Sequence, residues 1–213
     1  MKNDAYKTAA EEAYEIICRK IISGELSPGS KLTRRAMSEL TNVSMIPVIE
    51  ALHRLESEGL VDSVPQFGSH VIRLTNETIR DKFMMRLAVE AQVVRTLARH
   101  HTEEQLERFS FLSDDLDNTP RDEDHEDALW KRHYRFHMAL AEATGFRTMV
   151  RTLRNLNLFD LLQKSILSFS ATHSEIPKDH HQKIIDAIRT GNPDHAEQVM
   201  RAHVLFSGLV AGE

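Results

Sequence analysis

The feature that most constrains the fold is the scarcity of strand patterning. Apolar residues repeat at helical spacing along most of the chain. β-like stretches are confined to residues 60–64 and 70–74, and residues 65–69 join them as a hairpin. The 213 residues include six Pro and eight Gly, too few for a sandwich or barrel with many turns. The sequence therefore predicts a mainly α protein.

Composition narrows the cellular setting. The chain is 41% hydrophobic and 28% charged, so it is expected to fold. Its one cysteine, Cys18, excludes an intramolecular disulfide and fits a reducing compartment. The N-terminus is polar, with no signal peptide, and no stretch approaches the roughly 20 apolar residues of a membrane span. We therefore expect a cytoplasmic protein without membrane contact.

Three short helices precede the hairpin. The first is predicted over residues 6–23. Thr33 can N-cap the second, and Ser44 can N-cap the third, which has Pro47 in its first turn and Gly59 at its end. Three helices followed by a hairpin are typical of a winged helix-turn-helix, which places the start of its last helix in the DNA major groove.

The rest of the chain predicts an antiparallel all-helical bundle. A capping box at Thr102–Gln105 starts one helix, and the turn Gly191-Asn192-Pro193 joins the last two. The predicted helices cover about residues 76–101, 102–117, 123–144 and 147–169, followed by two that flank Gly191. The domain boundary falls near residue 75, giving a winged helix-turn-helix over 1–75 and a helical domain over 76–213.

Four histidines of the helical domain predict a metal site. His133 and His137 are four residues apart, so they share one helix face. His181 lies eleven residues before Asn192 and His203 lies eleven after it, which sets them at one height in an antiparallel hairpin. Four neutral imidazoles suit zinc, nickel, copper or iron better than magnesium or calcium.

The first domain resembles the DNA-binding domain of the GntR family over about residues 8–73. The resemblance rests on Gly24–Leu32, Val43-Ser44, Pro47-Val48, Glu50-Ala51-Leu52, Arg54-Leu55, Glu58–Val61 and Gly68. It implies a recognition helix that begins at Ser44. The expected DNA contacts are Arg34, Arg35, Ser44, Met45, Pro47 and Gly68.

The recognition helix departs from the family pattern at two positions. Met45 and Ile49 stand where the family usually has arginines, which reach guanine edges and phosphates. Met and Ile offer only apolar contact, for example to a thymine methyl group. Residues 1–75 hold nine basic and ten acidic residues, a net charge of −1, and the whole chain carries −5. Arg34 and Arg35 can compensate for the missing arginines through phosphate contacts.

The second domain resembles the FCD ligand-binding domain of FadR-type GntR regulators over about residues 76–210. The resemblance rests on Arg86–Glu90, Phe136-His137, His181–Ile188, Gly191-Asn192, Ala196, Met200 and His203. It implies a divalent metal held by one Asp and three His, with a small carboxylate effector completing the shell. His133 takes the aspartate's position, and the loss of that negative charge favours zinc or nickel.

Two further positions bear on the effector. Phe146 stands where the family often has Asn, so a polar contact to the ligand is absent from that position. Arg86 matches a family arginine that faces the acid group of the effector. A buried ion pair with Glu90 is an equally open reading of Arg86.

These features predict a ligand-responsive transcriptional regulator, not an enzyme. We expect a homodimeric repressor on a palindromic operator, sensing a small carboxylate or sugar acid at the metal. One alternative is a helical-bundle metalloenzyme. No residue near His133 or His137 reads as a committed base, although Glu142 lies on the same helix. Another alternative is a sensor with decayed DNA binding that acts through protein partners, which Met45 and Ile49 would favour.

Overall fold

The computed structural model describes residues 7–64, 68–120, 126–167 and 180–209. The chain divides into two compact units. One comprises Met1–Ile79 and Asn155–Phe169, and the other comprises Arg80–Arg154 and Ser170–Glu213. Among the described residues, no helix has the length and apolar character that a bilayer span requires.

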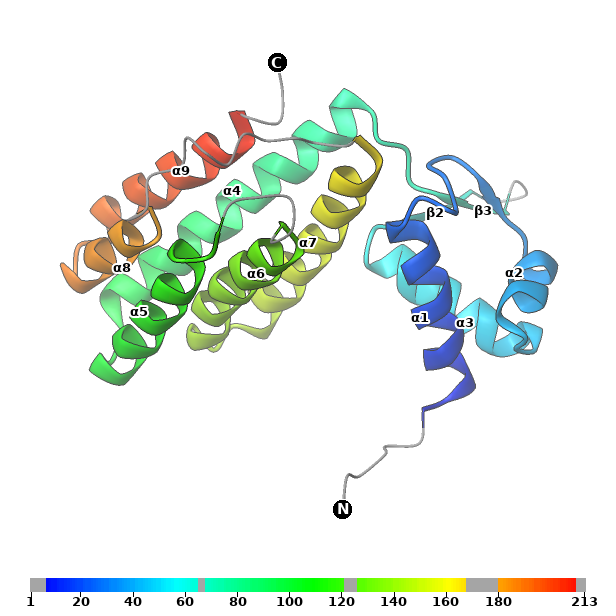
Figure 1. Cartoon of the computed structure of the whole chain (residues 1–213), viewed down its shortest axis with the longest axis horizontal. Coiled ribbons are helices and arrows are strands. Elements are labelled where there is room, and N and C mark those ends of the chain that lie inside the picture. Colours follow the sequence, from blue (N-terminus) through cyan, green and yellow to red (C-terminus); the bar gives the residue numbers. More distant parts are fainter. Residues whose placement is uncertain (1–6, 65–67, 121–125, 168–179, 210–213) are drawn as a thin grey trace. The chain divides into compact units, whose positions relative to one another are not determined.

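The first unit has the predicted winged helix-turn-helix elements. Its helices are α1 (Ala9–Ile22), α2 (Arg34–Thr41) and α3 (Met45–Ser57). Strands β2 (Val61–Val64) and β3 (Gly68–Val71) form the predicted hairpin (Figure 1). A two-residue strand that the sequence pattern did not reveal, β1 (Lys31–Leu32), pairs antiparallel with β3, so the sheet order is β1-β3-β2.

Local signals fix where the three helices begin. Thr8 forms a capping box with Glu11 at the start of α1. The Thr33 hydroxyl accepts a hydrogen bond from the Ala36 amide and caps α2, as expected. Asn42, in the left-handed conformation with φ of 55°, turns the chain from α2 into α3. Helices α1 and α3 pack on each other over a core of Ala13, Ile17, Ile21, Leu32, Met37, Val48, Ala51, Leu52, Leu55, Leu60, Val61, Val71 and Ile72.

Most of the remaining chain is helical. The helices are α4 (Asn76–Arg99), α5 (Glu103–Asp117), α6 (Glu126–Ala143), α7 (Arg147–Leu167), α8 (Gln182–Arg189) and α9 (Pro193–Leu209). In the second unit α5 packs on α6 and on α8, and α8 packs on α9 (Figure 1). The predicted capping box at Thr102 and the predicted Asn192 cap are both present. The expected start of α6 at residue 123 and end of α7 at residue 169 lie outside the described residues.

Candidate functional site

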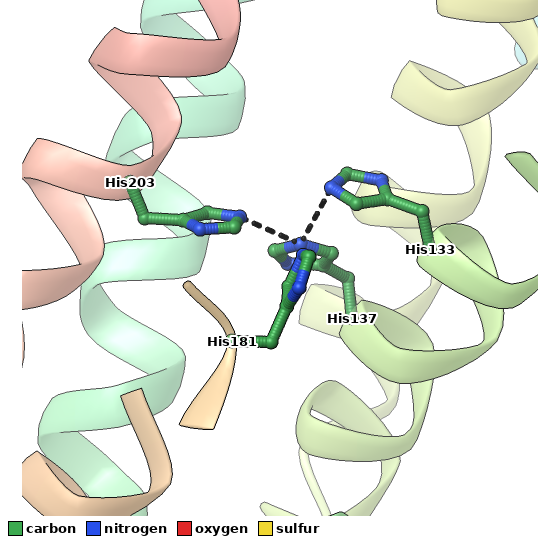
Figure 2. A group of neighbouring side chains, drawn as sticks. All are labelled: His133, His137, His181 and His203. Atoms are coloured by element: carbon green, nitrogen blue, oxygen red, sulfur yellow. Dashed lines mark hydrogen bonds between the residues drawn. The ribbon is translucent and has the colours of Figure 1, made fainter. Parts of the chain in front are cut away.

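Four histidine rings converge in the second unit. His133 and His137 lie on α6, and His203 lies on α9. His181 stands directly before α8 as its N-cap residue, not inside the helix as the sequence suggested. Figure 2 shows the four side chains pointing toward one another, and the distances between their ring centroids range from 4.4 to 6.2 Å.

The spacing of the ring nitrogens fits a single cation. Nε2 of His137 lies 3.2 Å from Nε2 of His133 and 3.1 Å from Nε2 of His203. One candidate ligand nitrogen from each of the four rings lies within 4.8 Å of the others. Zinc–nitrogen bonds of about 2.0–2.1 Å place two ligands of one ion roughly 3.0–4.2 Å apart, depending on the coordination geometry. The two Nε2 separations of His137 already lie in this range, and closing the widest separation would bring all four nitrogens onto one ion.

Two buried carboxylates orient these rings, and the sequence analysis assigned neither of them to the site. Glu90, on α4, makes a close ion-pair contact with Nδ1 of His137. Asp117, the last residue of α5, accepts a hydrogen bond from Nδ1 of His181 at 2.5 Å. A carboxylate on Nδ1 fixes the tautomer and turns Nε2 toward a metal, as in carboxylate–histidine–zinc arrangements. Their partners lie on other segments of the chain, so no sequence spacing could have signalled them.

Burial sets the charge state of the cluster. Burial, followed by the neighbouring histidine His137, holds the pKa of His133 and of His203 well below the ordinary value. These imidazoles are therefore neutral at pH 7, which is the form that binds metals. Burial alone would raise the pKa of Glu90. His137 and Arg86 outweigh this effect through their charges and hydrogen bonds, and they lower the pKa of Glu90 to about 2.

Arg86 forms the buried ion pair with Glu90 that was one of its two expected roles. Its side chain is buried, and its Nε donates to Oε1 of Glu90 at 2.6 Å. Glu90 in turn contacts Nδ1 of His137, so the guanidinium lies close to the cluster. A guanidinium carries five N–H donors, so an ion pair with Glu90 does not preclude contact with a ligand.

A fifth imidazole adjoins the cluster. On an ideal helix, His180 would point about 100° away from His181. His180 is instead half-buried, and its ring stacks on that of His203 with centroids 4.4 Å apart. The helical geometry did not apply because α8 begins only at Gln182. His180 therefore supports the position of His203.

The residues predicted to contact DNA lie on α2, α3 and the hairpin of the first unit. Arg34 and Arg35 open α2 and are exposed, and Arg35 donates to Glu39 at 3.0 Å. Ser44 and Met45 are exposed at the start of α3, where Pro47 is half-buried. Gly68 begins β3 with φ of +88°, a conformation that favours glycine.

Comparison with known proteins assigns two segments of the chain to known families. Residues 9–71 match the bacterial regulatory proteins of the gntR family, and residues 81–206 match the FCD domain. The transcriptional repressor RspR of Escherichia coli (strain K12) is 26% identical over 204 residues, which cover 91% of this chain and 85% of that protein. The probable D-xylose utilization operon transcriptional repressor of Paenarthrobacter nicotinovorans is 26% identical over 208 residues, covering 92% and 86%.

Solved structures share the fold. E. coli McbR/YncC superposes with a TM-score of 0.71 at 16% identity, covering 96% of this chain and 98% of that one. A GntR family member from Pseudomonas syringae pv. tomato str. DC3000 gives 0.56 at 19% identity, covering 95% and 84%. The matched families and the two repressors are transcription regulators, which sets the metalloenzyme alternative aside. The chain belongs to the GntR family of bacterial regulatory proteins, with a GntR helix-turn-helix segment followed by an FCD domain.

Proposed function

We propose that this regulator is a homodimeric repressor whose operator binding responds to a small carboxylate or sugar acid held at a metal ion. Residues 1–75 read the operator in this proposal, and residues 76–213 hold the metal and the effector. The ion is zinc, or alternatively nickel, bound by His133, His137, His181 and His203. The convergence of these four rings is the observation that carries the proposal.

The chemistry of the cluster supports a borderline metal. All four ligands are imidazoles, which suit zinc and nickel, whereas magnesium and calcium prefer oxygen ligands. Glu90 and Asp117 each contact an Nδ1 atom, which leaves Nε2 as the ligand nitrogen of His137 and of His181. These two carboxylates return some of the negative charge that a coordinating aspartate would supply.

The position of Arg86 supports an acidic effector. A carboxylate that joins the metal shell beside His133 would lie within the influence of this buried cation. An Arg guanidinium can hold a carboxylate through two parallel hydrogen bonds, which favours organic acids over neutral sugars. The ion pair with Glu90 would keep the guanidinium in place before the effector arrives.

Repression is supported by likeness to relatives. RspR of E. coli and the Paenarthrobacter nicotinovorans protein are both named as repressors. A two-fold dimer would read two half-sites, so the operator is expected to be a short palindrome. The effector would act by binding more tightly to one arrangement of the two readers than to the other.

Metal analysis of the purified protein tests the centre. Wild-type protein is expected to hold about one zinc or nickel per chain and to melt at a lower temperature after chelation. His203→Ala should lose the metal and its thermal stabilisation. His195→Ala, which removes an exposed imidazole from the same helix, is the matched control and should retain both. Metal retention by His203→Ala with unchanged affinity would contradict the assigned centre.

A gel-shift assay on the DNA upstream of the protein's own coding region tests the response. Lactate, citrate and gluconate serve as probes, each with zinc-loaded and chelated protein. Release of DNA by one acid from zinc-loaded protein alone is the expected result. Arg86→Lys keeps the positive charge but loses the planar guanidinium. It should therefore raise the concentration of that acid needed to release the DNA. DNA binding that ignores every acid in both states would oppose the sensor role.

A further inference from the structure

The start of α3 carries an exposed apolar tip formed by Met45 and Ile46. Met45 is 56% exposed and Ile46 is 73% exposed, the largest exposed fraction of any large hydrophobic side chain in the described chain. Ile49 is half-buried and lies four residues after Met45, so it extends the same helix face. The tip stands where a helix-turn-helix presents its reading residues to the major groove.

Packing within the first unit does not require these side chains. The core-facing side of α3 carries Val48, Ala51, Leu52 and Leu55, all of which are buried, whereas Met45 and Ile46 are exposed. A substitution at Met45 or Ile46 would therefore leave that core intact. Large apolar side chains that are exposed together at a binding position indicate a surface that is buried when a partner binds.

We propose that the apolar tip selects operators with A·T pairs by packing against the C5 methyl groups of thymine. This inference rests on the proposed operator binding and adds its base preference. Met and Ile have no hydrogen-bond donors for guanine O6 and N7, the atoms that arginines read. The thymine methyl is the apolar group on the major-groove edge of the bases, so it is the feature that these side chains can recognise.

The surroundings of the tip favour DNA over a protein partner. Ser44 caps α3 by position, but its hydroxyl makes no capping hydrogen bond, so it can donate to a phosphate at the helix N-terminus. Arg34 and Arg35 are exposed at the start of the preceding helix. The side chain of Lys31 lies beside Gly68, 3.5 Å from the point where a Cβ would stand, which brings a cation to the hairpin. These groups suit a phosphate backbone that flanks an apolar contact.

The test begins with selection of binding sites from random DNA by the full-length, metal-loaded protein. Selected half-sites are expected to carry A·T pairs at their central contacted positions. Replacement of one thymine by deoxyuridine in each half-site then removes only the methyl group. The loss should be about fourfold per methyl, the effect of burying one CH₂ group, and so about fifteenfold for the palindrome. Replacing a cytosine by 5-methylcytosine in a weak G·C-containing site should recover part of that factor.

Variants connect this effect to the tip. Met45→Ala and Ile46→Ala should bind thymine and deoxyuridine operators with more nearly equal affinity, because the methyl group has lost its partner. Phe111→Ala removes a side chain that is 67% exposed on α5 of the other unit, and it should keep the full discrimination. Unchanged melting temperatures would show that the variants remain folded.

Two results would overturn the inference, and they are distinguishable. Tight binding to selected sites without any response to deoxyuridine would refute methyl reading but leave operator binding intact. Failure to enrich any DNA sequence, even at low salt, would refute the proposed operator binding as well. The apolar tip would then be assigned to a protein partner, as in the decayed-sensor alternative.

Discussion

Nδ1 of His181 donates to Oδ1 of Asp117 across 2.5 Å, joining the residue that precedes α8 to the end of α5. Glu90 on α4 stands in the same relation to His137 on α6. Two of the four clustered imidazoles thus have a carboxylate on the nitrogen that faces away from the centre. Because each carboxylate and its histidine belong to different segments of the bundle, the packing of the bundle and the geometry of the cluster depend on each other.

Asp117→Asn should weaken metal binding. The substitution keeps the size of the side chain but removes the negative charge. In the wild type that charge orients His181 and makes its imidazole a better metal ligand. Loss of such a partner typically lowers metal affinity about 10–100-fold. Competition with a chromophoric zinc chelator measures the change. Asp186→Asn, on an exposed part of α8, is the matched control and should bind zinc as the wild type does. Equal affinities for both variants would contradict the positioning role of Asp117.

His133→Asp should change the preference of the site among metals. The substitution introduces the negative oxygen ligand that the FCD resemblance led us to expect at this position. Oxygen ligands favour manganese and magnesium relative to an all-imidazole site. The ratio of zinc affinity to manganese affinity is expected to fall, as measured by titration with each metal. A ratio equal to that of wild type would show that position 133 does not coordinate the ion.

Chelated protein should lose stability as the pH falls below about 6.5, the ordinary pKa of histidine. Burial depresses the pKa of His133 and of His203 in the folded state. In this window the unfolded chain binds protons that the folded chain does not. The free energy of unfolding therefore decreases as the pH is lowered. The slope is at most about 1.4 kcal/mol per pH unit for each histidine. Urea denaturation at a series of pH values measures it.

Control variants and a second pH window separate the histidine effect from other titrations. His203→Asn should reduce the slope near pH 6, whereas His195→Asn, which changes an exposed ring, should not. The pKa of Glu90 is lowered to about 2 from its ordinary 4.5. Its contribution to stability is therefore present above pH 4.5 and lost as the pH falls toward 2, below the histidine window. An identical slope in His203→Asn and wild type would disprove the assignment.

Sequence signals predicted the elements that depend on local chemistry. Thr33, Thr102 and Asn192 begin helices where their side chains were expected to, because an N-cap hydrogen bond involves only neighbouring residues. The mainly α fold and the hairpin were likewise confirmed. The convergence of the four histidines was also predictable in part, since i, i+4 spacing sets His133 and His137 on one face of α6.

Contacts between distant segments were not predictable in the same way. Glu90 and Asp117 are ordinary acidic residues in the sequence, and only the packing of α4 and α5 brings them to the histidines. Strand β1 has two residues, too short for any periodicity, and is formed by pairing with β3. The contact between His180 and His203 depends on where α8 begins, and helix boundaries are the least certain feature of a sequence.

The charge of the first domain predicts weak salt dependence of operator binding. Residues 1–75 have no net positive charge, so few phosphates are neutralised and few counterions are released. Arg34→Ala should lower affinity and reduce the slope of log K against log salt by about 2 in a dimer, one contact per protomer. The effect of Arg35→Ala should be smaller, because Arg35 already donates to Glu39 at 3.0 Å. Arg99→Ala removes an exposed charge at the end of α4 and should leave the slope unchanged. If Arg34→Ala weakens binding equally at all salt concentrations, Arg34 makes no phosphate contact.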